Sequence, residues 1–329
     1  MPEEEARPLL VVGLPRAGTT WVAGVLGRAA GATPRHEPDN AKEWPGAVPA
    51  TRALGRFPAL RPGERDASYH RLWQTVLLGP DRTQERREQV VKRLWGQPST
   101  DALEEVAQGR PPLRLRLAGY AALASRCLPS AATGKTCRVV KSVHAALAVE
   151  WIAETFAPSV VIVVRHPANV LASWLELELP DRGRNLHLEP RARERYARPW
   201  GLPDPQPGPL AATVWQLGLL LSALEQAADR HPEWTVVSHD HLCVDPEAAF
   251  EALTARLGLP WTEGTADFLR QGNRPGRGFE TAREASNLPE SWRRRLGPGE
   301  IEELKRTLAH FPLHRWRVDE LPGPTPGDG

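Results

Sequence analysis

Short apolar runs that alternate with helical stretches constrain the fold of this chain more than any other feature of its sequence. The runs cover residues 9–12, 138–140, 160–164 and 235–237, and the helical stretches cover residues 20–30, 145–156, 168–178 and 246–257. Short runs that are nearly continuous in apolar residues are typical of parallel strands covered on both faces. The alternation therefore predicts an α/β fold in which helices flank a doubly wound parallel sheet.

The rest of the chain fits around this sheet as one unit. The 329 residues, 41% of them hydrophobic, suffice for one large domain, so we expect a single α/β domain over residues 1–329. Within it we expect a helical insertion at residues 41–136, a proline-rich loop at residues 199–209 and a disordered tail at residues 321–329. No apolar run approaches the ~18 residues of a membrane span, and the start is acidic, so we expect a cytoplasmic protein.

Charge and cysteine usage exclude several partners. The 42 lysine and arginine residues against 40 acidic residues give a net charge of only +2, which argues against a nucleic-acid-binding surface. The three cysteines, Cys127, Cys137 and Cys243, lack the spacing of a zinc site, and we expect no metal. Any anion site must therefore be local, and it must consist mainly of arginine because lysine is scarce.

A glycine-containing loop follows the first predicted strand and opens the first predicted helix. It reads Gly13-Leu-Pro-Arg-Ala-Gly-Thr-Thr-Trp21. Glycines permit a tight turn whose backbone N–H groups cradle a phosphate, and the helix N-terminus adds its dipole. The glycine spacing is that of a P-loop and predicts a P-loop-type fold, but Thr19 stands where a nucleotide triphosphatase has lysine.

A second basic motif follows the strand at residues 160–164. It reads Val164-Arg-His-Pro-Ala-Asn-Val-Leu-Ala-Ser173. Arg165 leaves the carboxyl end of the strand, where open α/β sheets bind ligands, and Ser173 lies about two turns along the next helix. An arginine fork and a hydroxyl placed in this way can bind one phosphate.

These two motifs, in this order, resemble those of the PAPS-dependent sulfotransferases, particularly of bacterial members of actinobacterial type, where PAPS is 3′-phosphoadenosine 5′-phosphosulfate. The loop at residues 15–21 is similar to their 5′-phosphosulfate loop, and residues 165–173 to their 3′-phosphate motif. Residues 236–246, which read VVSHDHLCVDP and lead into LGLPW at 257–261, resemble a later segment of bacterial members. The resemblance covers residues 9–261 and implies a transferase that uses PAPS as donor and releases 3′,5′-ADP (PAP), without a metal.

The resemblance also implies roles for the donor-binding residues. Arg16, where the family often has lysine, contacts the sulfonate and the 5′-phosphate. Trp21 packs on the adenine or, in the plainer reading, belongs to the core. The remaining 5′-phosphate loop residues are Ala17, Gly18, Thr19 and Thr20.

Further roles fall on residues at the ends of two other predicted strands and on the helix that follows one of them. Arg165 and Ser173 bind the 3′-phosphate, which separates PAPS from ordinary adenine nucleotides. Lys141 matches a lysine that faces the transferred group. The glycine-rich basic segment at residues 272–278 is similar to a loop that closes over the donor, but its arginines are not assigned to the site.

Two residues compete for the general base that takes the acceptor proton. Glu37 follows the loop by about twenty residues, where a second strand should end, and resembles the catalytic glutamate of some members. His144 lies three residues after Lys141, whereas the histidine of other members lies two residues after that lysine. We favour Glu37, although a histidine needs less tuning of its pKa to act near neutral pH.

The acceptor and two rival functions remain open at this stage. We expect transfer to a hydroxyl or amine of a small-molecule, natural-product or carbohydrate acceptor. A P-loop small-molecule kinase that uses ATP–Mg²⁺ is the alternative, and a non-catalytic nucleotide-binding protein is a second one. Four tryptophans can line an acceptor cavity or simply belong to the core, namely Trp44, Trp73, Trp95 and Trp174.

Overall fold

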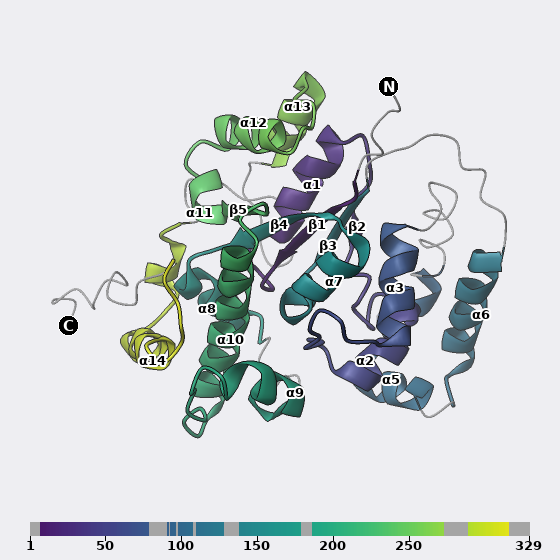
Figure 1. Ribbon diagram of the computed structural model, residues 1–329, viewed down its shortest axis with the longest axis horizontal. Helices are drawn as coiled ribbons and strands as arrows, with labels where there is room; N and C mark the ends of the chain where they lie inside the picture. Colours follow the sequence, from purple (N-terminus) through teal and green to yellow (C-terminus); the bar gives the residue numbers. More distant parts are fainter. Residues whose placement is uncertain are drawn as a thin grey trace.

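The structure is a computed structural model, shown in Figure 1, in which a central sheet lies between groups of helices. It describes residues 7–78, 91, 93–96, 98–107, 110–127, 138–178, 186–272 and 289–315. The expected tail at 321–329 therefore lies outside the described residues. None of the helices in these described ranges is both long and apolar enough to cross a membrane.

The sheet is parallel throughout its described strands. In chain order these are β1 (Leu9–Gly13), β2 (Arg35–His36), β3 (Val139–Ser142), β4 (Ser159–Val164) and β5 (Thr235–Ser238). They lie in the order β2-β3-β1-β4-β5, with β1 in the middle. The register places Val11 beside Lys141 on one side and Gly13 beside Val163 on the other. The carboxyl ends of β3, β1 and β4 are therefore neighbours at one edge of the sheet.

Both faces of the sheet are buried, which explains why its strands are continuously apolar. Leu9 and Val11 of β1 join a core cluster on the face covered by α1. Leu10 and Val12 point the opposite way and join a larger cluster on the other face. Alternate residues of one strand thus contribute to two separate cores, as the period of two along a strand requires.

The helices divide between these two faces. The described α-helices of four or more residues are α1 (Thr19–Ala29), α2 (Val48–Leu54), α3 (Ala67–Leu77), α5 (Thr100–Ala107), α6 (Leu113–Cys127), α7 (Val149–Phe156), α8 (Pro167–Glu176), α10 (Pro209–Arg230), α11 (His239–Leu242), α12 (Pro246–Arg256), α13 (Glu263–Gly272) and α14 (Pro298–Leu308). Helices α12 and α13 pack with α1 on one face, whereas α7, α8 and α10 cover the other (Figure 1). The α2, α3, α5 and α6 group extends beyond β2, and α14 packs on α10.

The predicted α/β class and the doubly wound parallel sheet are confirmed. All four predicted strands and their following helices are present, with bounds that differ by one or two residues, and the stretch at 145–156 divides into the short helix η2 (Ala145–Leu147) and α7. The four tryptophans belong to the core, since Trp44, Trp73, Trp95 and Trp174 are each no more than 6% exposed. Their indoles therefore stabilise the fold in this structure.

Candidate active site

The glycine loop between β1 and α1 has the backbone geometry of an anion cradle. Arg16 and Gly18 both adopt left-handed φ angles, 71° and 92°, which turn the chain sharply before Thr19 begins α1. The Ala17 amide donates to the Leu14 carbonyl at 3.0 Å and so is already used to close the turn. The first amides of a helix have no partner within it, so the start of α1 favours an anion.

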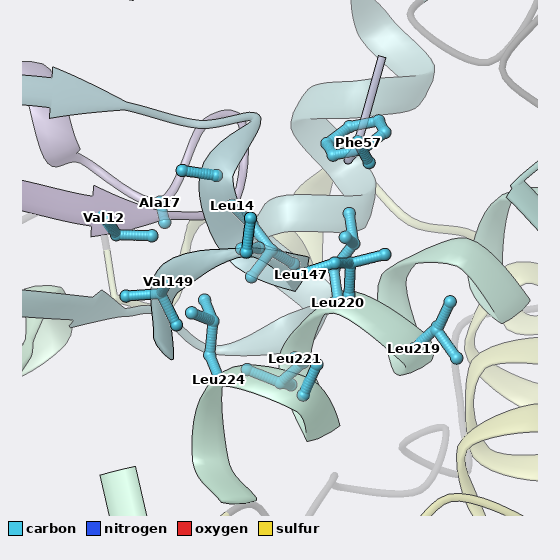
Figure 2. Packing of buried hydrophobic residues seen from close by; sticks show 14 of the residues in the cluster. Val12, Leu14, Ala17, Phe57, Leu147, Val149, Leu219, Leu220, Leu221 and Leu224 are labelled. Carbon is cyan, nitrogen blue, oxygen red and sulfur yellow. The ribbon is translucent and has the colours of Figure 1, made fainter. Parts of the chain in front are cut away.

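The loop is anchored to the core by its own apolar residues. Leu14 and Ala17 are almost fully buried and belong to the same cluster as Val12 (Figure 2). The Pro15 carbonyl accepts a hydrogen bond from the Trp174 indole N–H at 2.7 Å. A hydrogen bond from α8 therefore anchors the loop, and packing fixes its strained backbone.

The two predicted phosphate motifs meet at Arg16. The Arg16 Nε donates to the Ser173 hydroxyl at 3.0 Å, and an Arg165 guanidinium nitrogen donates to the Arg16 carbonyl at 3.0 Å. Three residues predicted to bind the donor are thus directly linked: one from the loop after β1, one that directly follows β4 and one from α8. The loop and the carboxyl end of β4 therefore bring two arginines together.

Arg165 is a buried cation with an unused donor. Its side chain is 9% exposed, and its Nε is buried without a hydrogen-bond partner among the described residues. Burial lowers the pKa of Arg165 to about 10, an effect that the Asp240 carboxylate opposes, so the guanidinium remains charged at neutral pH. A buried charge with an unsatisfied donor is costly unless an anion completes it.

Glu37 and Lys141 form the second half of the site. The Lys141 Nζ lies 2.5 Å from a Glu37 carboxylate oxygen, and the Asn40 amide donates to the other oxygen at 2.9 Å. Burial raises the pKa of Glu37, but the charges of Lys141 and His144 and these hydrogen bonds outweigh it and lower that pKa to about 2. Glu37 is therefore an ionised, strongly paired carboxylate, and its side chain is 22% exposed.

His144, the rival base, is enclosed. Its side chain is fully buried, its Nε2 accepts a hydrogen bond from Arg56 Nε at 2.9 Å, and its ring contacts the ring of Phe57. The Nε2 lone pair is therefore already engaged. In this structure Glu37 has the more accessible basic atom.

Trp21 and His239 flank the start of α1. Trp21 is half-buried and packs edge-on against Phe250 of α12 and His239 of α11. A Cβ at Gly18 would meet the His239 ring at 2.1 Å, so the imidazole lies directly against the loop. Burial, assisted by the charge of Arg165, lowers the pKa of His239 to about 3, which keeps this imidazole neutral.

A sequence comparison identifies the family to which this site belongs. The model of the Sulfotransferase family matches residues 8–263, which include the loop, Glu37, Lys141 and the Arg165 motif. The chain belongs to the sulfotransferase family. The resemblance stated from its motifs is thereby confirmed. A search of curated protein sequences finds no match.

Solved sulfotransferase structures were also matched. The sulfotransferase domain of the Synechococcus PCC 7002 olefin synthase is 13% identical, with 93% of this chain and 96% of that chain covered and a TM-score of 0.44. The sulfotransferase domain from the curacin biosynthetic pathway is 13% identical, with coverage of 94% and 99% and a TM-score of 0.46. A sulfotransferase from Mycobacterium avium is 14% identical, with coverage of 95% and 78% and a TM-score of 0.40.

The structure also reveals residues beside this candidate site that the sequence analysis did not single out. Asp240 accepts the His166 backbone N–H at 2.7 Å and thereby joins the segment after β5 to the Arg165 motif. Asn169, fully buried on α8, donates to the Pro289 carbonyl and to Asp240. Both residues lie inside motifs that were recognised, so only their contacts were unforeseen. The arginines of residues 273–278 lie outside the described residues.

Proposed function

We propose that this sulfotransferase transfers a sulfuryl group from PAPS to a hydroxyl or amine of a small-molecule or carbohydrate acceptor. The observation that carries the proposal is the linked set of Arg16, Arg165 and Ser173 beside the glycine loop. Such a set suits a nucleotide with phosphates at two positions, because it offers one cation from the loop after β1 and another from the end of β4. Family membership supports the same reaction class.

On this proposal each motif binds one end of the donor. The Arg165 guanidinium and the Ser173 hydroxyl bind the 3′-phosphate, and the buried unpaired Nε of Arg165 gains an acceptor. Gly18, Thr19 and Thr20 bind the 5′-phosphate at the start of α1, where the helix dipole favours negative charge. The half-buried indole of Trp21 packs against the adenine.

The reaction is an in-line displacement at sulfur. The acceptor oxygen or nitrogen forms a bond to sulfur, the bond from sulfur to the 5′-phosphate oxygen breaks, and 3′,5′-ADP leaves. Arg16 stabilises the negative charge that develops between the sulfonate and the leaving phosphate. Glu37 takes the acceptor proton, because its carboxylate is ionised and partly accessible.

The Lys141–Glu37 ion pair makes this base responsive to the donor. A carboxylate with a pKa of about 2 is a weak base while Lys141 holds it. When Lys141 turns its ammonium to the sulfonate, Glu37 loses its strongest favourable partner while the burial that raises its pKa remains. The base then strengthens only with donor in place. Enclosed His144 has no such arrangement.

Calorimetric titration of the purified chain with 3′,5′-ADP, 5′-ADP and ATP–Mg²⁺ tests the donor site. We expect 3′,5′-ADP to bind most tightly, and Arg165→Ala to remove that preference. Arg230→Ala is the matched control, since this arginine pairs with Glu150 on the surface away from the loop.

The alternatives give different results. Tighter binding of ATP–Mg²⁺ would refute the proposal in favour of a small-molecule kinase, and binding of none of the three would point to a non-catalytic protein. Transfer of labelled sulfuryl groups from PAPS to a panel of phenols, sugar alcohols and amines then identifies the acceptor class. Loss of this transfer in His144→Ala with normal turnover in Glu37→Gln would reverse the assignment of the base.

A further inference from the structure

Asp39, two residues after Glu37, carries a second carboxylate that the proposed reaction does not use. Its side chain is 2% exposed, and both of its oxygens accept from the Ser142 hydroxyl, at 2.8 and 2.7 Å. Ser142 ends β3 and directly follows Lys141. A buried hydrogen bond therefore joins the turn after β2 to the end of β3.

The Ser142 hydroxyl is saturated by this arrangement. Its oxygen accepts the backbone N–H of His144 at 3.0 Å and that of Ala145 at 3.1 Å, and its proton goes to Asp39. A hydroxyl has one donor and two acceptor positions, so all three are used. Asp39 thus fixes the orientation of the group that shapes the backbone immediately after Lys141.

The turn that carries Glu37 needs such a restraint. Glu37 has a left-handed φ of 47°, which costs about 1–2 kcal/mol for a residue with a Cβ. Its N–H donates to the Lys141 carbonyl at 2.7 Å, and its carbonyl accepts from the Asn40 N–H at 3.0 Å. Strained residues persist only where several contacts fix them, and the Asp39–Ser142 contact is one more tie between the same turn and the same strand.

Stability of the fold does not explain this carboxylate. Burial raises the pKa of Asp39 to about 7, with the Ser142 hydrogen bond opposing and the charge of Glu37 assisting. The other groups that face it are Lys141, His144 at 3.9 Å and the buried phenol of Tyr69 on α3. Apolar residues of similar shape in place of both Asp39 and Ser142 are often no less stabilising than such a buried pair.

We propose that Asp39 is a positioning residue for sulfuryl transfer: through Ser142 it locks the turn at residues 37–40 onto the end of β3 and so holds the Glu37 carboxylate on Lys141. The role rests on the proposed function, whereas the contacts are independent of it. Asp39 touches neither donor nor acceptor in this scheme and acts through Glu37 and Lys141.

Amide hydrogen exchange of the full chain measures directly how firmly the turn at residues 37–40 is held on β3. In Asp39→Ala we expect the amides of Glu37, His144 and Ala145 to exchange about tenfold faster or more, while the amides of β4 keep their protection. The matched control is Asp245→Ala, which removes an aspartate that caps α12 through the Ala248 N–H. Exchange that stays as in the wild type, or that rises equally in β4, would overturn the proposal.

Turnover supplies the second readout. We expect the release of labelled sulfate from PAPS, with water as the probe acceptor, to fall about 100-fold in Asp39→Ala, while the Kd for 3′,5′-ADP stays within about threefold. Asp39→Asn, whose amide oxygen still accepts from Ser142, should recover most of the lost rate. A rate in Asp39→Ala equal to that of Asp245→Ala would contradict the positioning role.

A second variant and a binding control keep the test decisive. If Asp39→Ala does not fold, Ser142→Ala removes the same tie from the other side and should give the same local exchange and the same loss of rate. Unchanged exchange and rate in that variant would refute the proposal. A wild-type chain that does not bind 3′,5′-ADP would refute the proposed function, and the exchange pattern would still decide whether Asp39 restrains the turn.

Discussion

Replacement of Lys141 by methionine removes the cation from Glu37 while it keeps most of the side-chain volume. The pKa of Glu37 is about 2 against an ordinary value of 4.5, and this difference corresponds to about 3 kcal/mol of net stabilisation of the carboxylate. Without Lys141 the carboxylate is still buried, so its pKa should rise above 4.5. Because one partner of a largely buried pair is lost, we expect Lys141→Met to reduce the free energy of unfolding by about 3–5 kcal/mol at pH 7.

The pH dependence gives this prediction a definite sign. In the wild type the pKa of Glu37 is lower in the folded than in the unfolded chain, so its contribution is present above pH 4.5 and is lost as pH falls toward 2. In Lys141→Met the raised pKa reverses the sign, and the ionised carboxylate lowers stability at neutral pH. The difference between the two proteins should therefore be largest near pH 7 and shrink toward pH 3.

Urea unfolding at several pH values measures both effects. A cycle with Glu37→Gln and the double variant isolates the pair, and we expect a coupling of about 3 kcal/mol at pH 7. Lys305→Met on α14 is the control, with an expected change below about 0.5 kcal/mol. A coupling below about 0.5 kcal/mol at pH 7, or a difference that does not vary with pH, would show that the ion pair does not organise the site.

Three further predictions concern the donor loop and its surroundings. Arg165→Ala should weaken binding of 3′,5′-ADP by about 30–100-fold, because one charged hydrogen-bonding group is lost, and should leave binding of 5′-ADP almost unchanged. Equal losses of affinity for both ligands in calorimetry would contradict this prediction. Gly18→Ala should lower the melting temperature and abolish binding, because φ is 92° and the new Cβ would meet the His239 ring at 2.1 Å. Gly31→Ala, also at positive φ but with open space around it, should cost only backbone strain, and similar damage from both variants would exclude the clash. The pKa of Asp39 is raised to about 7, so wild-type stability should decline as pH rises from about 4 to 7, and a denaturation series should show a flatter profile for Asp39→Asn.

The sheet and the loop could be predicted because their signals are local. Each strand is buried on both faces, so it is apolar over its whole length, and the glycine loop lies directly between β1 and α1. The two-residue strand β2 has no such signal, because residues 35–36 are polar and half-buried. Its position was inferred only from where Glu37 should lie.

Pairings between distant residues could not be predicted in the same way. The ion pair of Glu37 with Lys141 joins residues 104 positions apart, and the Arg16–Ser173 contact joins residues 157 positions apart. Each of these four residues was identified from its own motif. A motif does not indicate which distant residue its side chain will contact in the folded chain. Asp39 and Ser142 carried only a weak signal in the sequence, namely their position near Glu37 and Lys141. A buried polar residue has a hydrogen-bond partner, but the sequence does not show which polar residues are buried.

The double attachment of Arg16 determines what a lysine at this position would change. Its side chain holds Ser173 and its carbonyl holds Arg165, so one residue ties the loop to both parts of the second motif. A lysine at position 16 lacks the Nε–H that binds Ser173 here and would leave that hydroxyl to another donor. We therefore expect Arg16→Lys to free the Ser173 hydroxyl from the loop, while the bond from Arg165 to the carbonyl of residue 16 remains.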